Sequence, residues 1–298
     1  MQAHFKNAKK KSKKILDQAM HQVPREILHD LFTRQTGNNL LRKMLSKKNI
    51  LKSPAKINLT LDILGKDGDY HLVNTVICEV ENLYDEITIE LLSKTGGKIE
   101  IKTSNKELNR DPENNLAYKA AKLIAPKASI RIFIKKNIPL RSGLGGGSSN
   151  AATVLKELNR QLGLNLDVRA LRHLAATISM DAPFFITGGI ARATHFGEII
   201  ESIKTDLRLK PQLVFNDKSK TSTAEMYSKI DALPTGRNHA KTEKLIKALA
   251  DNDLKGVINN LHNDFELLFP TTYPNHLSGA GSAYYFLPYF AKGLNFSS

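Results

Sequence analysis

Residues 139–152 read Pro-Leu-Arg-Ser-Gly-Leu-Gly-Gly-Gly-Ser-Ser-Asn-Ala-Ala, and this stretch says most about the fold. An alternating segment, 129–135 (SIRIFIK), precedes it, and a helical pattern follows it to about Leu162. Glycines between a strand and a helix let backbone N–H groups approach phosphate oxygens without a Cβ in the way, and the helix N-terminus adds unpaired donors. No Gly-Lys-Ser/Thr closes the turn, and the spacing is not G-x-G-x-x-G, so a P-loop and a dinucleotide fingerprint are excluded. We therefore expect a phosphate-binding loop of another type.

The rest of the chain beyond residue 52 is regular enough to predict its elements. Residues 55–64 (AKINLTLDIL) alternate apolar and polar side chains, which is typical of a half-buried strand. Further strands are expected at 72–81, 86–92, 98–102 and 129–135. Residues 214–217 are expected to end another strand. Helices are expected at 115–124, from the glycine-rich loop to 162, and at 167–178, 222–230, 240–251 and 253–262. In this order the strands come first, followed by a crossover helix and a helix-rich second half. The order indicates an α+β chain of two lobes that meet near residue 205.

Composition excludes several classes of protein. Of 298 residues, 41% are apolar and 24% charged, which is typical of a folded globular chain rather than a disordered or fibrous one. The longest mostly apolar stretch, residues 182–193, is too short to span a bilayer. A single cysteine, Cys78, excludes a disulfide framework and a multi-cysteine metal site, and suits a reducing compartment.

The positive charge is concentrated near the N-terminus. Residues 1–43 hold 10 Lys/Arg and 3 Asp/Glu, whereas residues 44–298 hold 34 and 26. No apolar segment follows the lysine run at 9–14, so it is not a secretory signal. The segment could be an arm that contacts RNA or a membrane, an organelle-targeting segment, or an extension upstream of a start at Met44. We favour the extension.

Several motifs together resemble one known family. The loop at 139–152 resembles the second motif of the GHMP kinases, the superfamily of galacto-, homoserine, mevalonate and phosphomevalonate kinases. Its triple glycine and double serine narrow the resemblance to the family that phosphorylates 4-diphosphocytidyl-2-C-methyl-D-erythritol. Matching segments follow in order at 53–59 (SPAKINL), 67–71 (DGDYH, with one residue inserted), 181–185 (DAPFF), 222–227 (STAEMY) and 278–282 (SGAGS).

The resemblance implies a fold in three parts. Residues 1–52 would be a basic extension outside the family core. Residues 53–205 would form the ATP-binding lobe, which shares its fold with a ribosomal-protein domain, and 206–298 a ferredoxin-like lobe. Only residues 267–277 separate the segment Asn-Asp-Phe-Glu at 263–266 from the motif at 278, where the family has a longer helical segment. We therefore expect a shortened second lobe.

The resemblance also implies a reaction and a site. The family transfers the γ-phosphoryl group of ATP to the tertiary 2-hydroxyl of its substrate, in the non-mevalonate route to isoprenoid precursors. The implied catalytic pair is Lys56 and Asp181. The implied ATP-binding residues are Asn115, near the adenine, and Gly143, Leu144, Gly145, Gly146, Gly147, Ser148, Ser149 and Asn150. The implied substrate-binding residues are Asn58, Tyr70, His71 and Tyr227.

Each of these residues also has an ordinary structural interpretation. A lysine on a strand is commonly a solvated edge residue, while an aspartate before a proline, or an asparagine before a helix, is commonly an N-cap. The alternation does place Lys56 and Asn58 on one face of the strand. The nine histidines form no metal-ligand spacing, so Mg²⁺ is expected to arrive with ATP rather than to occupy a dedicated site.

Other functions remain open at this stage. One is a different GHMP kinase, acting on homoserine or a mevalonate-type substrate. Another is a degenerate, non-catalytic copy that binds a nucleotide or RNA through the basic segment. For partners we expect a small-molecule substrate, no membrane, no nucleic acid beyond that segment, and a monomer or homodimer. The expected location is the bacterial cytoplasm, with a plastid as the alternative.

Overall fold

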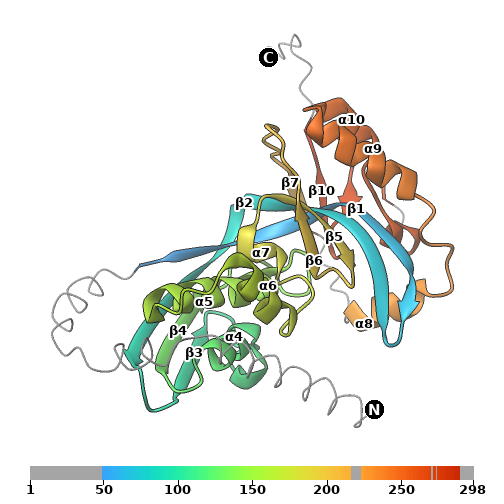
Figure 1. Ribbon diagram of the computed structural model, residues 1–298. Coiled ribbons are helices and arrows are strands. Elements are labelled where there is room, and N and C mark those ends of the chain that lie inside the picture. Colours follow the sequence, from blue (N-terminus) through green and yellow to red (C-terminus); the bar gives the residue numbers. More distant parts are fainter. Residues whose placement is uncertain (1–48, 216–222, 270, 273, 289–298) are drawn as a thin grey trace, which may run out of the picture. The chain divides into compact units, whose positions relative to one another are not determined.

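The computed structural model describes residues 49–215, 223–269, 271–272 and 274–288 (Figure 1). Nearly all of the described residues belong to one compact unit, residues 50–298. The predicted extension over residues 1–52 therefore lies outside the described residues, except for 49–52.

Two sheets and seven α-helices make up the described part of the chain. The first sheet has the order β3-β4-β2-β1-β8, with β5 paired to β2 and β6 to β5, and the second has the order β7-β10-β9. The strands are β1 Leu51–Asp67, β2 Tyr70–Ser93, β3 Ile99–Thr103, β4 Ser129–Lys135, β5 Ile190–His195, β6 Ile199–Ser202, β7 Gln212–Phe215, β8 His262–Asn263, β9 His276–Leu277 and β10 Ala283–Phe286. The helices are α4 Leu116–Ile124, α5 Gly146–Leu162, α6 Val168–Ala176, α7 Phe184–Thr187, α8 Thr223–Ile230, α9 His239–Ala250 and α10 Leu254–Asn259.

The predicted strand at 55–64 and helix after the glycine-rich loop are confirmed as parts of β1 and α5. The prediction of two strands at 72–81 and 86–92 was wrong, because both belong to the single strand β2. The pairing with β1 jumps from Ala55 opposite Val80 to Pro54 opposite Tyr84, so residues 81–83 bulge out of the ladder. Residues 82 and 83, which lie between the two predicted strands, are part of this bulge.

Two other differences concern short elements. The helix predicted over 253–262 ends at Asn259, and His262 instead pairs in parallel with Thr60 of β1. Burial of His262 beside Asp62 holds the chain in the sheet at this point. The strands β5 and β6, which extend the first sheet beyond β2, were not predicted.

Helices α4, α5, α6 and α7 cover one face of the first sheet (Figure 1). Strand β4 shows why: Ile130, Ile132 and Ile134 are fully buried under the helices, while the residues between them point away. Helix α5 meets this face with small side chains such as Ala151 and Ala152, which lets its backbone lie close to the strands. The N-terminus of α5 thereby lies beside Lys56, near the start of β1.

A second apolar cluster joins β1 to the C-terminal half. Ala55, Ile57 and Leu59 of β1 pack with Leu249 of α9 and Tyr285 of β10. This cluster contains residues from both sides of position 205. The boundary near 205 and the shortening of the second lobe stay predictions, while the mixed sheets and helices are of the predicted α+β class.

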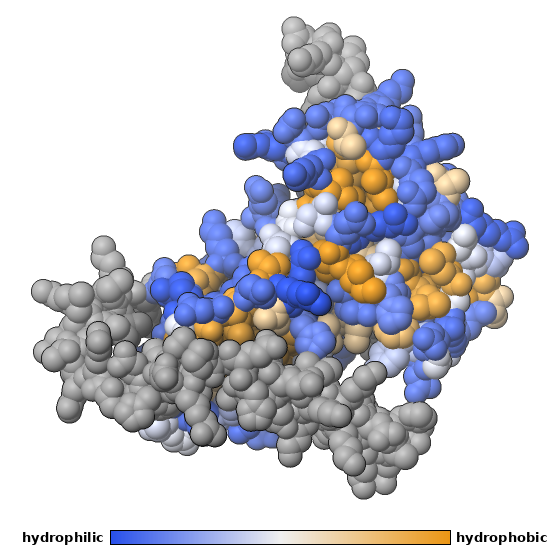
Figure 2. All heavy atoms as spheres, in the orientation of Figure 1, coloured by the Kyte–Doolittle hydropathy of each residue, from blue (hydrophilic) through white to orange (hydrophobic). Residues whose placement is uncertain are grey.

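No helix in the described part of the chain is long and apolar enough to cross a membrane. Hydrophilic residues dominate the face seen in Figure 2, and the apolar surface lies in separate patches among them. Such scattered apolar residues are ordinary on a protein surface.

A buried polar cluster fastens α9 and β8 to β1. Thr242 of α9 donates a hydrogen bond of 2.6 Å to Asp62 Oδ2, and His262 Nε2 lies 3.0 Å from Asp62 Oδ1. Thr242 and Asp62 are fully buried. These bonds keep the pKa of Asp62 below its usual value although burial acts in the opposite direction.

Thr242→Val should test this attachment. The valine keeps the shape and removes the hydroxyl, leaving a buried carboxylate oxygen without that donor, so the free energy of unfolding should fall by about 1–3 kcal/mol. Urea unfolding measures the change. Thr177→Val, at the exposed C-cap of α6, is the matched control and should show no measurable change. Equal stability of Thr242→Val and wild type would show that the cluster does not stabilise the fold.

Candidate functional site

A cavity of about 390 Å³ lies where the glycine-rich loop meets β1 and β2. Ten of the predicted site residues line it: Lys56, Asn58, Gly143, Leu144, Gly145, Gly146, Gly147, Ser148, Asp181 and Tyr227. The fold thus brings together residues that are up to 171 positions apart in the sequence. The remaining predicted residues, which are Tyr70, His71, Asn115, Ser149 and Asn150, do not line the cavity.

The glycine-rich loop is attached to β1 by its backbone. The N–H of Lys56 donates to the carbonyl of Leu144 at 3.0 Å, so the loop runs alongside the strand that carries Lys56. Gly145 caps α5 with a φ of 70°, and a Cβ there would lie 3.0 Å from Lys56 Cγ. Helix geometry leaves the first N–H groups of α5, from Gly146 to Ser148, without intrahelical acceptors. A phosphate chain fits this position.

A second glycine-rich loop, residues 278–282, rests on the first. A Cβ on Gly143 would lie only 2.1 Å from the carbonyl oxygen of Ser278, so this contact requires glycine. Ser278 Oγ donates to the carbonyl of Gly143 at 3.2 Å. From the other side, Asn263 donates to the carbonyls of Leu277 and Gly279 at 2.9 and 2.8 Å. The sequence analysis identified the motif at 278–282 but did not predict that it contacts the first loop.

Lys56 is buried in the cavity wall, with 3% of its surface exposed. Its Nζ donates to Asn58 Oδ1 at 2.6 Å and lies 3.9 Å from Asp181 Oδ2. The predicted shared face of Lys56 and Asn58 is thus confirmed, and a solvated edge position for Lys56 is excluded. Burial lowers the pKa of Lys56, and the negative charge of Asp181 opposes that shift. Asp181 keeps 43% of its side chain exposed, in a turn just before α7.

The two loop serines have different surroundings. Ser148 lines the cavity, and its hydroxyl lies 2.8 Å from that of Ser179, two residues before Asp181. This contact links the glycine-rich loop to the turn that carries the carboxylate of Asp181. Ser149 is fully buried, and its hydroxyl accepts from Ser53 at 2.8 Å. Its side chain therefore attaches the loop to Ser53 of β1 and does not face the cavity.

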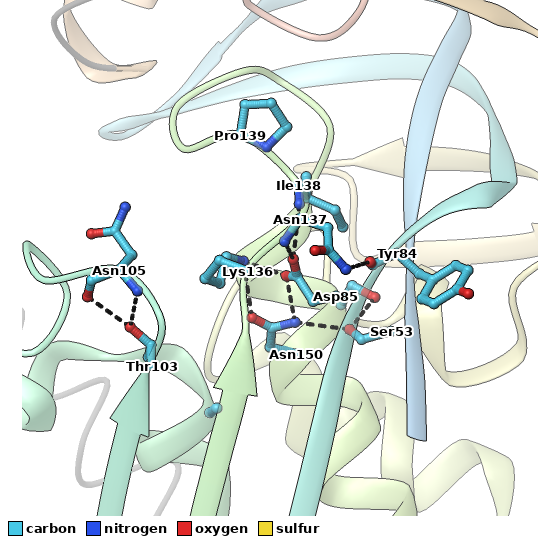
Figure 3. Close-up of polar contacts among 12 residues, drawn as sticks. Ser53, Tyr84, Asp85, Thr103, Asn105, Lys136, Asn137, Ile138, Pro139 and Asn150 are labelled. Atoms are coloured by element: carbon cyan, nitrogen blue, oxygen red, sulfur yellow. Dashed lines mark hydrogen bonds and ion pairs between the residues drawn. The ribbon is translucent and has the colours of Figure 1, made fainter. Parts of the chain in front are cut away.

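A buried aspartate holds the strand–loop junction together (Figure 3). Asp85 Oδ1 accepts the backbone N–H groups of Asn137 and Ile138 at 2.8 and 2.9 Å. Its Oδ2 accepts from Lys136 Nζ and, at 2.9 Å, from Asn150 Nδ2. Asn150 thus belongs to this network rather than to the cavity. Lys136 Nζ lies 3.3 Å from where a Cβ of Gly146 would be, so the network also places a positive charge at the N-terminus of α5.

The aromatic residues at the other end of the site divide into two pairs. The ring of His71 stacks on that of Tyr227 at 4.4 Å, and His71 Nε2 lies 2.6 Å from Asp231 Oδ1. Tyr70 is 55% exposed and packs against Phe196, which lines the cavity. Burial and the charge of Asp181 raise the pKa of Tyr227 above its ordinary value, so that ring stays neutral.

Asn115 is an N-cap, as its ordinary structural interpretation predicts. Its side chain accepts from the N–H of Ala117 at 3.0 Å, and the next residue, Leu116, lines the cavity. Three further cavity residues, Thr75, Lys136 and Phe196, were missed by the sequence analysis. Arg141 and the motif residues Gly279 and Ala280 line the cavity as well. Lys136 could have been noticed from its place just before the loop. Among the described residues no group of three or more His, Cys, Asp or Glu side chains is arranged for a metal ion.

Comparison with known proteins defines the class of protein. The family described as GHMP kinases N terminal domain matches residues 115–189, which include the phosphate loop and Asp181. The mevalonate kinase of Methanococcus jannaschii shares the fold, with a TM-score of 0.56 and 16% identity over 81% of this chain and 90% of that one. The fold and the loop are those of a GHMP kinase, and the predicted fold class is confirmed.

Relatives of higher identity narrow the class to one family. The 4-diphosphocytidyl-2-C-methyl-D-erythritol kinase of Caldicellulosiruptor saccharolyticus is 36% identical over 230 residues, which are 76% of this chain and 77% of that protein. The enzyme of that name from Clostridium perfringens is 38% identical over 221 residues, which are 72% and 75%. A crystal structure of 4-(cytidine 5'-diphospho)-2C-methyl-D-erythritol kinase has a TM-score of 0.61 and 28% identity, over 80% of this chain and 90% of that one. The chain belongs to the 4-diphosphocytidyl-2-C-methyl-D-erythritol kinase family.

Asp85→Asn should destabilise the protein strongly. The variant turns an amide N–H₂ toward Lys136 and Asn150, which are themselves donors, and leaves the buried ammonium of Lys136 without its counter-ion. Breaking a buried ion pair in this way lowers the free energy of unfolding by about 3–5 kcal/mol. Chemical unfolding of the full chain measures it.

The matched control for that variant is Asp251→Asn, which removes an exposed carboxylate paired with Lys247 on α9. It should leave stability unchanged, because water replaces the lost contact. Similar unfolding midpoints for the two variants would mean that Asp85 is not the anchor of the strand–loop junction.

Proposed function

We propose that this protein transfers the γ-phosphoryl group of ATP to the 2-hydroxyl of 4-diphosphocytidyl-2-C-methyl-D-erythritol. Family membership supports the reaction. The observation that carries the assignment of roles is the pair Lys56 and Asp181, 3.9 Å apart at the end of a phosphate-binding loop. Phosphoryl transfer needs a cradle for the triphosphate, a group that orients the acceptor hydroxyl, and positive charge for the transition state.

The cradle for ATP is the N-terminus of α5 and its loop. The backbone N–H groups of Gly146, Gly147 and Ser148 would bind phosphate oxygens, aided by the helix dipole and by the ammonium of Lys136. Mg²⁺ would neutralise charge on the phosphates. It would be held chiefly by ATP itself, and the hydroxyl of Ser148, which lines the cavity, would supply a side-chain oxygen.

Lys56 and Asp181 would act on the acceptor side. Asp181 is exposed to the cavity and would accept a hydrogen bond from the 2-hydroxyl, which orients the oxygen toward the γ-phosphorus and takes the proton as the bond to phosphorus forms. Lys56 would offset the negative charge on the transferring group, at a place where burial strengthens the electrostatic interaction. In a loose transition state orientation matters more than the basicity of the carboxylate.

The cytidine end of the substrate would lie toward Tyr227 and His71. Both rings offer flat surfaces for a pyrimidine, and Tyr227 lines the cavity beside Asp181. With a neutral imidazole, His71 Nε2–H donates a hydrogen bond to Asp231 Oδ1, which leaves Nδ1 as an acceptor for an exocyclic amino group. Tyr70 would reach the base from the neighbouring position on β2, and Asn58 would contact the sugar-derived end.

Substrate-dependent release of ADP from Mg²⁺-ATP by the full chain tests the reaction. Lys56→Ala and Asp181→Asn should each lower kcat about 100-fold or more while ATP affinity stays nearly constant, because neither side chain belongs to the triphosphate cradle. Titration with ATP and steady-state kinetics measure the two quantities. Lys247→Ala on α9 and Asp251→Asn at the C-cap of that helix are controls of the same residue types. Full turnover of either active-site variant would overturn the assigned roles, and turnover with homoserine or mevalonate alone would overturn the assigned substrate.

His71→Ala should raise KM for the cytidine substrate about 10-fold or more and leave KM for ATP unchanged. Stacking of a base on an aromatic side chain is worth about 1–3 kcal/mol, and the variant removes that surface together with the Nδ1 acceptor. His173→Ala, on the exposed face of α6, is the control. An unchanged KM for the substrate would move the cytidine end away from His71.

A further inference from the structure

A short chain of hydrogen bonds leads from Lys56 to a residue with no assigned role, Thr75 on β2. Lys56 Nζ donates to Asn58 Oδ1 at 2.6 Å, and Asn58 Nδ2 donates to Thr75 Oγ1 at 2.8 Å. The Thr75 hydroxyl in turn donates to the backbone carbonyl of Thr60. All three side chains that form these hydrogen bonds are buried, with 3% of Lys56, 4% of Asn58 and 3% of Thr75 exposed.

The direction of each bond is fixed by chemistry. A carbonyl oxygen such as that of Thr60 only accepts, so the Thr75 hydroxyl proton points to it and presents its lone pairs to Asn58. The N–H₂ group of Asn58 must therefore face Thr75, which turns Oδ1 toward Lys56. An ammonium only donates, so the far end of the chain requires the same orientation. The Asn58 amide is thus held from both sides.

We propose that Thr75 is a positioning residue, which fixes the amide of Asn58 so that its oxygen aims the Lys56 ammonium at Asp181 and the transferring phosphoryl group. This inference rests on the proposed function, because it gives Lys56 a role in the transfer. Thr75 lies on the strand that pairs with β1 and reaches Asn58 across a register shift between Asn58 and Thr60. That shift brings the hydroxyl under the amide.

The surroundings of Lys56 make this support necessary. Burial disfavours the charged form of the lysine, and the carboxylate of Asp181 is 3.9 Å away. The register partner of Lys56 on β2 is Glu79, whose charge acts on Lys156 instead. The other titratable groups on the cavity wall are Glu107, Lys136, Arg141 and Tyr227. The Asn58 oxygen, at 2.6 Å, is the hydrogen-bond acceptor that favours the ammonium.

The test compares Thr75→Val with Thr75→Ser in the full chain. Valine has nearly the same shape and cannot accept from Asn58, so the amide is free to turn and its buried N–H₂ loses its acceptor. We expect kcat to fall about 10-fold in Thr75→Val, since one such bond is worth about 1–1.5 kcal/mol, with KM for ATP unchanged. Thr75→Ser keeps the hydroxyl and should retain kcat within about threefold.

The pH profile gives a readout that a packing defect would not move. A less firmly held Asn58 oxygen favours the ammonium less, so the pKa of Lys56 should fall further in Thr75→Val. The loss of activity at high pH, which follows deprotonation of Lys56, should then occur at a lower pH in Thr75→Val than in wild type and Thr75→Ser. NMR titration of ¹³C-labelled lysine, with the Lys56 signal assigned from Lys56→Arg, measures the same change without turnover.

The outcomes separate this inference from the proposed function. Wild-type kcat and an unmoved Lys56 titration in Thr75→Val would overturn the role of Thr75, and so would an equal loss in Thr75→Ser. Should Thr75→Val not fold, Thr75→Cys offers similar volume with a poor hydrogen-bonding group, and the same comparison applies. Absence of substrate-dependent turnover in the wild type would count against the proposed reaction, while the NMR titration would still decide whether Thr75 holds the Lys56 ammonium.

Discussion

The site depends on one backbone hydrogen bond, from the N–H of Lys56 to the carbonyl of Leu144. A strand and a glycine-rich loop that are 88 positions apart are joined at this bond. Because side chains alternate along β1, this attachment points Lys56 and Asn58 into the space beneath the loop. The N-terminus of α5, the Lys56 ammonium and the Asp181 carboxylate are therefore positioned together.

Much of this could be read from the sequence, for identifiable physical reasons. The apolar–polar alternation at 55–64 gave the strand and the shared face of Lys56 and Asn58. The glycines between a strand and a helix indicated the loop, since few other structures need so many residues without side chains. The family motifs supplied Asp181, which no local pattern could distinguish from an N-cap.

The remainder depends on distances along the chain that local patterns cannot reveal. Thr75 is one of many polar residues in β2, directly after Asn74, and nothing local distinguishes it from the others. Only the pairing of β1 with β2, with its register shift near Asn58, brings it to the amide. The polar residues Glu81 and Asn82 favour a turn in isolation, but strand pairing on both sides keeps them in β2 as part of a bulge. In the sequence Asp85 resembles an ordinary turn residue, but in the structure it is buried and accepts four hydrogen bonds. Tertiary pairing decides each of these cases.

The contact between the two glycine-rich loops ties distant halves of the sequence into one mutational unit. The carbonyl of Ser278 occupies the space where a side chain on Gly143 would be, and Ala283 N–H donates to the carbonyl of Ser142 at 3.0 Å. Neither loop can change its backbone path alone, because the backbones of the two loops pack directly against each other. A chimera that exchanges the C-terminal half with that of a relative must therefore accept this phosphate loop as its counterpart, or carry residues 142–145 along with it.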